Sequence, residues 1–287
     1  MKASVSTWIF GPRPIDDVIA TVHRLRYHGI ELRGEPDLYD PAHVRAALES
    51  RGMSTTSICG MYPGPNPGEL RDLAHPDAQE RQRAVEYVTR CVELAHALDA
   101  PVVIVTPNPV AKLTPLASTD DEWSYAIEAV REAATTAEQA GVTLAIEPIN
   151  RYETYLINSV ATARRFADDV ASPAVGVMLD TFHANIEDPD LTSAVLAAGD
   201  RLAHVHMADS NRQALGRGHL DVRSFARVLH ATGYAGALAM EPLPPISNPY
   251  VALTQGAPLD QLETYLDECA RSLELAGVTL PIRDGSG

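Results

Sequence analysis

Residues 142–148 read VTLAIEP, residues 175–180 read VGVMLD, residues 202–209 read LAHVHMAD and residues 237–242 read ALAMEP. Each segment is a short apolar run, rich in Val, Leu, Ile, Ala and Met, that ends at or near an Asp, Glu or His. Such runs are typical of strands that are buried on both faces of a parallel sheet. The longer intervals between them have helical periodicity, so this part of the chain predicts repeated strand–helix units.

The same alternation extends to the N-terminus and gives eight units in all. The predicted strands span residues 3–9, 29–32, 53–58, 101–106, 142–147, 175–180, 202–208 and 237–241. The predicted helices span residues 15–28, 41–50, 77–98, 120–140, 159–170, 191–198, 222–231 and 259–276. Several of these helices are followed by the glycine that commonly ends a helix, including Gly29 and Gly141.

Eight successive strand–helix units can close into an α/β barrel of the (β/α)8 or TIM-barrel type, which covers both faces of every strand and leaves no free edge. We therefore expect residues 1–287 to form a single barrel domain, and no low-complexity linker divides them. The alternative is an open, doubly wound sheet. That alternative lacks its best marker, because no GxGxxG motif follows the first predicted strand.

The composition argues against several classes of function. The 287 residues include 23 Lys and Arg against 38 Asp and Glu, a net charge of −15, which repels nucleic acid and anionic membranes. Residues 1–14 contain an apolar stretch too short and too broken by Gly and Pro for a signal peptide or a membrane span. The three cysteines are far apart, which fits neither a disulfide framework nor a thiolate zinc site. We expect a cytoplasmic protein whose partner is a small molecule.

The four quoted segments place acidic and imidazole side chains at one end of the barrel. Strand alternation puts Glu147, Asp180, His206 and Glu241 at the carboxyl ends of four consecutive strands, where active sites of this fold lie. Each residue alone could be a salt-bridge partner or a core histidine. Three carboxylates around one axis, however, repel one another unless a cation neutralises them. The mostly oxygen donor set therefore predicts a site for Mn²⁺, Mg²⁺ or Co²⁺.

Longer motifs extend these segments into the loops that follow them. They are EPINRYE at 147–153, LDTFHANIED at 179–188, HVHMADSNR at 204–212 and MEP at 240–242. With these motifs the chain resembles, over nearly its whole length, the sugar isomerases and epimerases of the xylose isomerase-like TIM barrels. Within that group it looks most like the ketose 3-epimerases typified by the enzymes for D-tagatose and D-psicose (allulose).

The resemblance implies roles for seven residues. In that family one divalent metal ion, with Mn²⁺ the first expectation and Co²⁺ or Mg²⁺ the alternatives, is bound by residues that match Glu147, Asp180, His206 and Glu241. The two glutamates also act as the acid/base pair. The family's substrate-binding groups match Glu153, His183 and Arg212. Asp209 stands where the family often has glutamate. Family members are commonly dimers or tetramers, so a homodimer or homotetramer is expected.

The chemistry of such a site is consistent with epimerisation. A divalent ion that chelates the carbonyl and a neighbouring hydroxyl of a ketose acidifies the adjacent C–H and stabilises an enediolate. If one carboxylate removes the proton and the other returns one to the opposite face, the configuration at C3 is inverted. If the proton returns to the adjacent carbon, a ketose becomes an aldose. Two opposed glutamates favour inversion, so the sequence predicts a metal-dependent epimerase of a free ketose.

Other activities and a non-catalytic role remain alternatives. The same metal and bases could drive isomerisation, dehydration or elimination of an inosose, hydroxypyruvate or a 3-keto-glycoside. An endonuclease IV-like nuclease would need further ligands from the earlier strands, including histidines, and the predicted ends of strands two to four offer only Glu31, Cys59 and Thr106. A binding protein without catalysis would be expected to lack one of the four metal ligands.

Three segments leave the identity of the substrate open. Residues 6–14 (STWIFGPRP) and the loop 242–258 depart from the sugar-epimerase patterns, and both are expected to shape the pocket. Residues 217–219 could receive a phosphate, but no strong phosphate-binding loop is evident. A free sugar or cyclitol is therefore favoured over a phosphorylated one.

Overall fold

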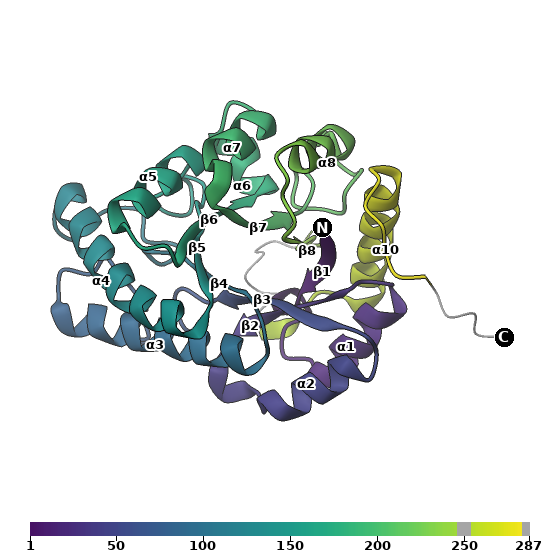
Figure 1. Ribbon diagram of the computed structural model, residues 1–287, viewed down its shortest axis with the longest axis horizontal. Coiled ribbons are helices and arrows are strands. Elements are labelled where there is room, and N and C mark those ends of the chain that lie inside the picture. The colour runs from purple at the N-terminus through teal and green to yellow at the C-terminus, as the bar shows by residue number, and fades with distance from the viewer. Residues whose placement is uncertain (246–253, 283–287) are drawn as a thin grey trace.

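The fold is a closed barrel of eight parallel strands, drawn in Figure 1 as arrows inside a ring of helices. The computed structural model describes residues 1–245 and 254–282. The strands follow one another in chain order, and β1 pairs with both β2 and β8. They are β1 (Lys2–Ser6), β2 (Gly29–Gly34), β3 (Ser54–Gly60), β4 (Val102–Val105), β5 (Thr143–Ile146), β6 (Val175–Asp180), β7 (Leu202–Met207) and β8 (Ala237–Met240). The predicted (β/α)8 barrel is confirmed.

Helices connect the strands and cover the outside of the barrel (Figure 1). The α-helices are α1 (Ile15–Arg24), α2 (Pro41–Glu49), α3 (Ala78–Ala97), α4 (Thr119–Ala140), α5 (Val160–Val170), α6 (Thr181–Glu187), α7 (Leu191–Ala198), α8 (Val222–Ala231) and α10 (Leu259–Leu275). Short 3₁₀ segments form η1 (Thr7–Phe10), η2 (Pro36–Leu38) and η3 (Gly199–Arg201). In the described part of the chain, no helix is both long enough and apolar enough to cross a membrane.

The long helices have local start and stop signals and an apolar face turned toward the strands. In α3, Val88, Val92 and Ala95 recur at helical spacing and are buried. The α4 helix begins at Ser118, whose side chain accepts a hydrogen bond from a backbone amide of the first turn, and it ends at Gly141 with a φ of 68°. Burial of these faces fixes the ring of helices on the barrel.

The glycine expected to end the first helix has a different role. The α1 helix ends at Arg24, and Gly29 is the first residue of β2. A Cβ atom at Gly29 would lie 2.0 Å from the carbonyl oxygen of Ser54 in β3. Glycine is needed here because two backbones approach closely, so its assignment as a helix end was wrong.

The structure differs from the predicted elements at two further places, both at the carboxyl end of the barrel. The first strand ends at Ser6 rather than at residue 9, and η1 then turns Trp8 and its neighbours. The segment after Asp180, predicted as a loop, forms α6, which begins where the Asp180 carboxylate accepts a hydrogen bond from the amide of Phe182. This helix has seven residues, which is too short for helical periodicity to reveal it.

Candidate active site

The strand register brings the four expected metal ligands, called here the four-residue cluster, to one end of the barrel. Asp180 at the end of β6 pairs directly with His206 in β7. Glu147 and Glu241 are the first residues after β5 and β8, so they lie at the same carboxyl-terminal edge. All four side chains are buried, and Glu147 is the most exposed of them at 8%.

The Nδ1 atom of His206 lies among the three carboxylates. It is 3.2 Å from Oε2 of Glu241, 3.8 Å from Oε1 of Glu147 and 3.9 Å from Oδ2 of Asp180. This buried nitrogen has no hydrogen-bond partner of acceptable geometry among the described residues. Donor atoms of Glu147, Asp180 and His206 all lie within 4.8 Å of one another. The chain therefore carries a cluster with the chemistry of a divalent-metal site.

Electrostatics also favour a cation at this point. Burial raises the pKa of Glu147 to about 8, and the charges of Asp180 and Glu241 add to the rise while His206 opposes it. Burial would lower the pKa of His206, but the carboxylates of Glu241 and Glu31 raise it well above its ordinary value. Without a metal ion, the cluster thus reduces its negative charge by retaining protons. A divalent cation would displace those protons and neutralise the carboxylates.

Arg212 supplies a fixed positive charge beside the cluster. Its guanidinium forms ion pairs with Oδ2 of Asp180 and, at 2.6 Å, with Oε2 of Glu241. Burial would raise the pKa of Asp180, but Arg212 holds that pKa well below its usual range. The loop that carries Arg212 is organised by the buried carboxylate of Asp209, which accepts hydrogen bonds from three backbone amides of the same loop. Arg212 thus lies in the candidate site and not in a surface salt bridge.

His183 and Glu153 are connected through Asn150, which the sequence did not single out. The side-chain amide of Asn150 donates to Oε1 of Glu153 and to Nδ1 of His183, both at 2.8 Å. Because Nδ1 accepts this bond, the proton of a neutral His183 ring is on Nε2, which lies 3.8 Å from Oδ2 of Asp180. The position of Asn150 within the EPINRYE motif was the signal that could have identified it.

Two residues at the site come from the first two strand–helix units, where no ligand was predicted. Nε1 of Trp8 donates a hydrogen bond to Oε1 of Glu241 at 2.5 Å. Glu31 in β2 is fully buried and lies 3.0 Å from Nε2 of His206 and 2.8 Å from Nε2 of His204. A charged residue inside the strand GIELRG was a signal for Glu31, whereas a tryptophan after a strand usually indicates ordinary packing.

A cavity of about 340 Å³ is lined by the residues expected to bind substrate. Glu153, His183 and Arg212 all border it, together with Trp8 and the ring of Phe182. Since Arg212 and Trp8 also contact Glu241, the cavity adjoins the four-residue cluster. The structure therefore brings the three expected substrate-binding residues and the four expected metal ligands together.

Both segments that depart from the sugar-epimerase patterns contribute to this cavity. Trp8 belongs to the segment 6–14, and residues 243–245 belong to the loop 242–258. Residues 246–253 of that loop lie outside the described part of the structure. The described walls of the cavity thus combine residues of the quoted motifs with residues of these two segments.

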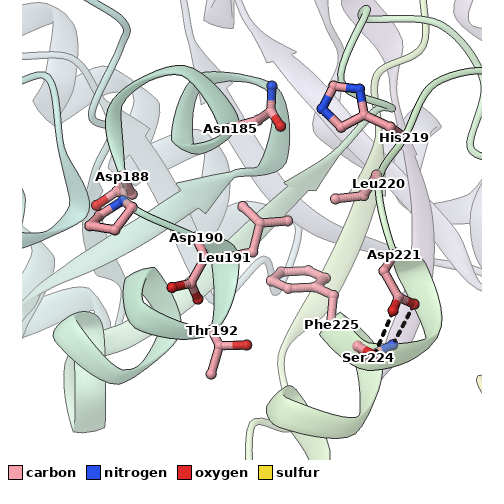
Figure 2. Close-up of a pocket in the computed structure, with 11 residues that line it drawn as sticks. Asn185, Asp188, Asp190, Leu191, Thr192, His219, Leu220, Asp221, Ser224 and Phe225 are labelled. Atoms are coloured by element: carbon pink, nitrogen blue, oxygen red, sulfur yellow. Dashed lines mark hydrogen bonds between the residues drawn. The ribbon is translucent and has the colours of Figure 1, made fainter.

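A second pocket of about 320 Å³ lies between α7 and α8 (Figure 2). None of the seven expected metal- or substrate-binding residues lines it, although His219 of the segment 217–219 does, and its acidic side chains Asp190 and Asp221 cap the N-termini of these two helices. Arg217, which was considered as a phosphate ligand, donates to Glu268 at 2.6 and 2.8 Å. These pairings give no support to a phosphate site in the described part of this region.

The closed barrel and the acidic cluster at its carboxyl end define a TIM-barrel protein with a candidate metal-dependent active site. Residues 19–276 match the family described as the xylose isomerase-like TIM barrel. The chain belongs to this family.

Several proteins similar to this chain are sugar epimerases. The D-psicose 3-epimerase of Ruminiclostridium cellulolyticum is 34% identical over 231 residues, which are 78% of this chain and 76% of that protein. The 3-dehydro-D-guloside 4-epimerase of Escherichia coli is 27% identical over 84% of this chain and 92% of its own. The crystal structure of D-psicose 3-epimerase with D-tagatose from Clostridium cellulolyticum has a TM-score of 0.83 at 25% identity and covers 98% of this chain and 100% of that one. The prediction of a carbohydrate epimerase or isomerase is confirmed.

Proposed function

We propose that the protein inverts the configuration at C3 of a free ketose. The observation that carries the proposal is the pair of buried glutamates, Glu147 and Glu241, that converge with Asp180 and His206 beside the substrate-sized cavity. Glu147 follows β5 and Glu241 follows β8, with two strands between them in the barrel. They would therefore approach one substrate carbon from different sides, which is what inversion requires. The D-psicose 3-epimerase relatives support this reading.

The four-residue cluster would hold the metal ion, with Mn²⁺ proposed first and Co²⁺ or Mg²⁺ as alternatives. Carboxylates and one imidazole suit these cations, and the buried Nδ1 of His206 is available as a donor atom. A bound divalent ion supplies polarisation of the substrate carbonyl, which acidifies the adjacent C–H.

The chain's own residues would perform the proton transfers and position the sugar. One glutamate of the pair removes the proton from C3, and the other delivers a proton to the opposite face. Nε2–H of His183 and the remaining N–H groups of Arg212 would donate to substrate oxygens, and the fact that both side chains line the cavity supports this role. The Glu153 carboxylate, oriented by Asn150, would accept a hydrogen bond from a sugar hydroxyl.

A 4-epimerase acting on a 3-keto-glycoside is the second candidate. The observation that favours it is the Escherichia coli 3-dehydro-D-guloside 4-epimerase, of whose length the match covers 92%. The same pair of carboxylates would then invert C4, which is adjacent to the ketone at C3. The two candidates differ in which C–H becomes acidic, so they predict different positions of solvent exchange.

Deuterium labelling tests the proposed function. We expect the Mn²⁺-loaded protein, incubated in D₂O with a panel of free ketoses, to incorporate deuterium at C3 of both epimers of at least one ketose, as located by NMR. With two opposed bases, the proton returned to C3 comes from the second glutamate, which exchanges its proton with solvent, so deuterium from D₂O enters at C3. An Asp180→Ala variant, which removes one candidate ligand, serves as the background for exchange without catalysis.

The other outcomes of that experiment are equally informative. Label appearing in an aldose would indicate isomerisation. Label at C4 of a 3-keto-glycoside, with no exchange into any ketose, would replace the first candidate by the second. Turnover confined to a cyclitol or to hydroxypyruvate would contradict both candidates.

Loss of the Trp8 indole N–H should slow catalysis while leaving the cavity wall in place. A hydrogen bond to a charged carboxylate contributes about 1.5 to 3 kcal/mol, so Trp8→Phe is expected to lower kcat about 10- to 150-fold. The matched control is Trp123→Phe, because Nε1 of Trp123 donates to Asp169 at 3.0 Å away from the site. Steady-state kinetics of both variants check the prediction. A kcat of Trp8→Phe equal to that of Trp123→Phe would show that the hydrogen bond from Trp8 to Glu241 does not contribute to catalysis.

A further inference from the structure

Glu31 is a buried carboxylate that none of the proposed catalytic steps uses. It has no exposed surface and lies in β2. Its two oxygens accept hydrogen bonds from Oγ of Ser6 at 2.6 Å and Oγ of Ser57 at 2.8 Å. Nε2 of His204 and Nε2 of His206 lie at 2.8 and 3.0 Å. A Glu31 oxygen also lies within 4.8 Å of possible ligand atoms of Cys59, His206 and Glu241, but both Glu31 oxygens already accept hydrogen bonds from serine hydroxyls.

The strands that carry these groups are irregular where the groups lie. The pairing of β2 with β3 shifts register between Ile30 and Glu31, so that Glu31 pairs with Ser57. The pairing of β6 with β7 shifts between Val177 and Met178, and Met178 pairs with His204. Such bulges change the direction in which side chains point. Both irregularities thus lie beside the contact that joins β2 to β7 across the interior of the barrel.

His206 connects Glu31 to the four-residue cluster because its two ring nitrogens face different partners. Nε2 is directed to Glu31, while Nδ1 faces Glu147, Asp180 and Glu241. A carboxylate can only accept, so the bond keeps a proton on Nε2 and leaves Nδ1 as the atom directed at the cluster.

We propose that Glu31 is a positioning residue for the metal ligand His206. It fixes the orientation of the imidazole ring and keeps Nε2 protonated, so that Nδ1 presents its lone pair to the metal ion. This inference rests on the proposed metal site. A carboxylate behind a ligating histidine also makes the imidazole a stronger donor, and loss of such a partner typically weakens metal binding 10- to 100-fold.

The test is metal affinity, measured without any sugar. Mn²⁺ is titrated calorimetrically into the metal-free full-length protein and into Glu31→Gln, which keeps the shape of the side chain but removes its charge. We expect the dissociation constant to rise about 10- to 100-fold in Glu31→Gln. Glu35→Gln is the matched control, because Glu35 is another buried glutamate that follows β2 but pairs with Arg71. Its Mn²⁺ affinity should equal that of the unaltered protein.

A spectroscopic readout separates positioning from a purely structural role. In the Co²⁺-loaded protein, the N–H proton of a coordinated imidazole gives a hyperfine-shifted NMR signal that disappears in D₂O. We expect this signal to shift or to exchange faster in Glu31→Gln and to remain unchanged in Glu35→Gln. If Glu31→Gln fails to fold, Ser57→Ala removes only one hydrogen bond to the carboxylate, and a smaller loss of Mn²⁺ affinity is expected.

The outcomes distinguish this inference from the proposed function. Equal Mn²⁺ affinity and an unchanged N–H signal in folded Glu31→Gln would overturn the role of Glu31 and leave the metal site intact. An unaltered protein that binds no Mn²⁺ or Co²⁺ would overturn both. Weakened metal binding in Glu31→Gln, in a protein that epimerises no ketose, would support the role of Glu31 and contradict only the proposed reaction.

Discussion

Replacing Glu147 with glutamine is expected to lower the rate of ketose epimerisation by about 10²- to 10⁴-fold, because the amide cannot accept the proton from C3. Glutamine has nearly the same shape and keeps an oxygen for the metal ion. The variant should therefore fold and retain Mn²⁺ binding, though with reduced affinity. NMR measures deuterium incorporation at C3, and calorimetric titration measures Mn²⁺ binding. Together the two measurements separate loss of the base from loss of the metal ion.

Two further variants serve as comparisons for Glu147→Gln. One alters a glutamate outside the site, and the other alters Glu241, the second glutamate of the proposed acid/base pair. Glu128→Gln alters an exposed glutamate on α4 and should leave the rate unchanged. Glu241→Gln should reduce interconversion as severely as Glu147→Gln. In a two-base reaction each epimer loses its proton to a different glutamate, so residual exchange in the two variants should favour opposite epimers. Epimerisation by Glu147→Gln at the normal rate would contradict the assignment of Glu147 as a base.

Removal of the metal ion is expected to reduce activity by at least about 10³-fold, and added Mn²⁺ should restore it. Polarisation of a carbonyl by a divalent ion is worth several kcal/mol in the transition state, and about 4 kcal/mol corresponds to this factor. The measurement is epimerase activity after dialysis against a chelator, then after return of Mn²⁺, Co²⁺ or Mg²⁺ in turn. Full activity in the metal-free protein would contradict the proposed mechanism.

Metal removal should also lower thermal stability, which gives a readout independent of catalysis. Three buried carboxylates repel one another without a cation. A ligand present at 100 times its dissociation constant stabilises the native state by about 2.7 kcal/mol, which corresponds to several degrees in melting temperature. Calorimetric melting with and without Mn²⁺ checks this, and Asp180→Ala, which leaves no ligand atom at that position, should abolish most of the difference. The same melting temperature in both states would show that Mn²⁺ does not stabilise the native protein and would contradict the metal site.

Much of the barrel could be predicted from local sequence. The bounds of β6 and α7 agree with the predicted residues at both ends, because an apolar run ended by Asp180 and a helix capped by Asp190 are both marked locally. The helix α6 was missed because its start depends on the Asp180 carboxylate, which was assigned only to a metal. The first turn of α6 includes His183. The resemblance to the epimerase motifs predicted that His183 binds substrate, but it did not indicate that the residue lies in a helix.

By itself, the sequence determined the eight strand–helix units and the four candidate ligands, because each ligand ends an apolar strand and strand alternation fixes the face on which it lies. Only the tertiary structure decided how these ligands are supported. Trp8 meets Glu241 across 233 residues of chain, and Glu31 meets His206 across 175. Periodicity reports which face of its own element a residue occupies, whereas a partner across the barrel depends on closure, strand register and bulges, which involve all the strands together.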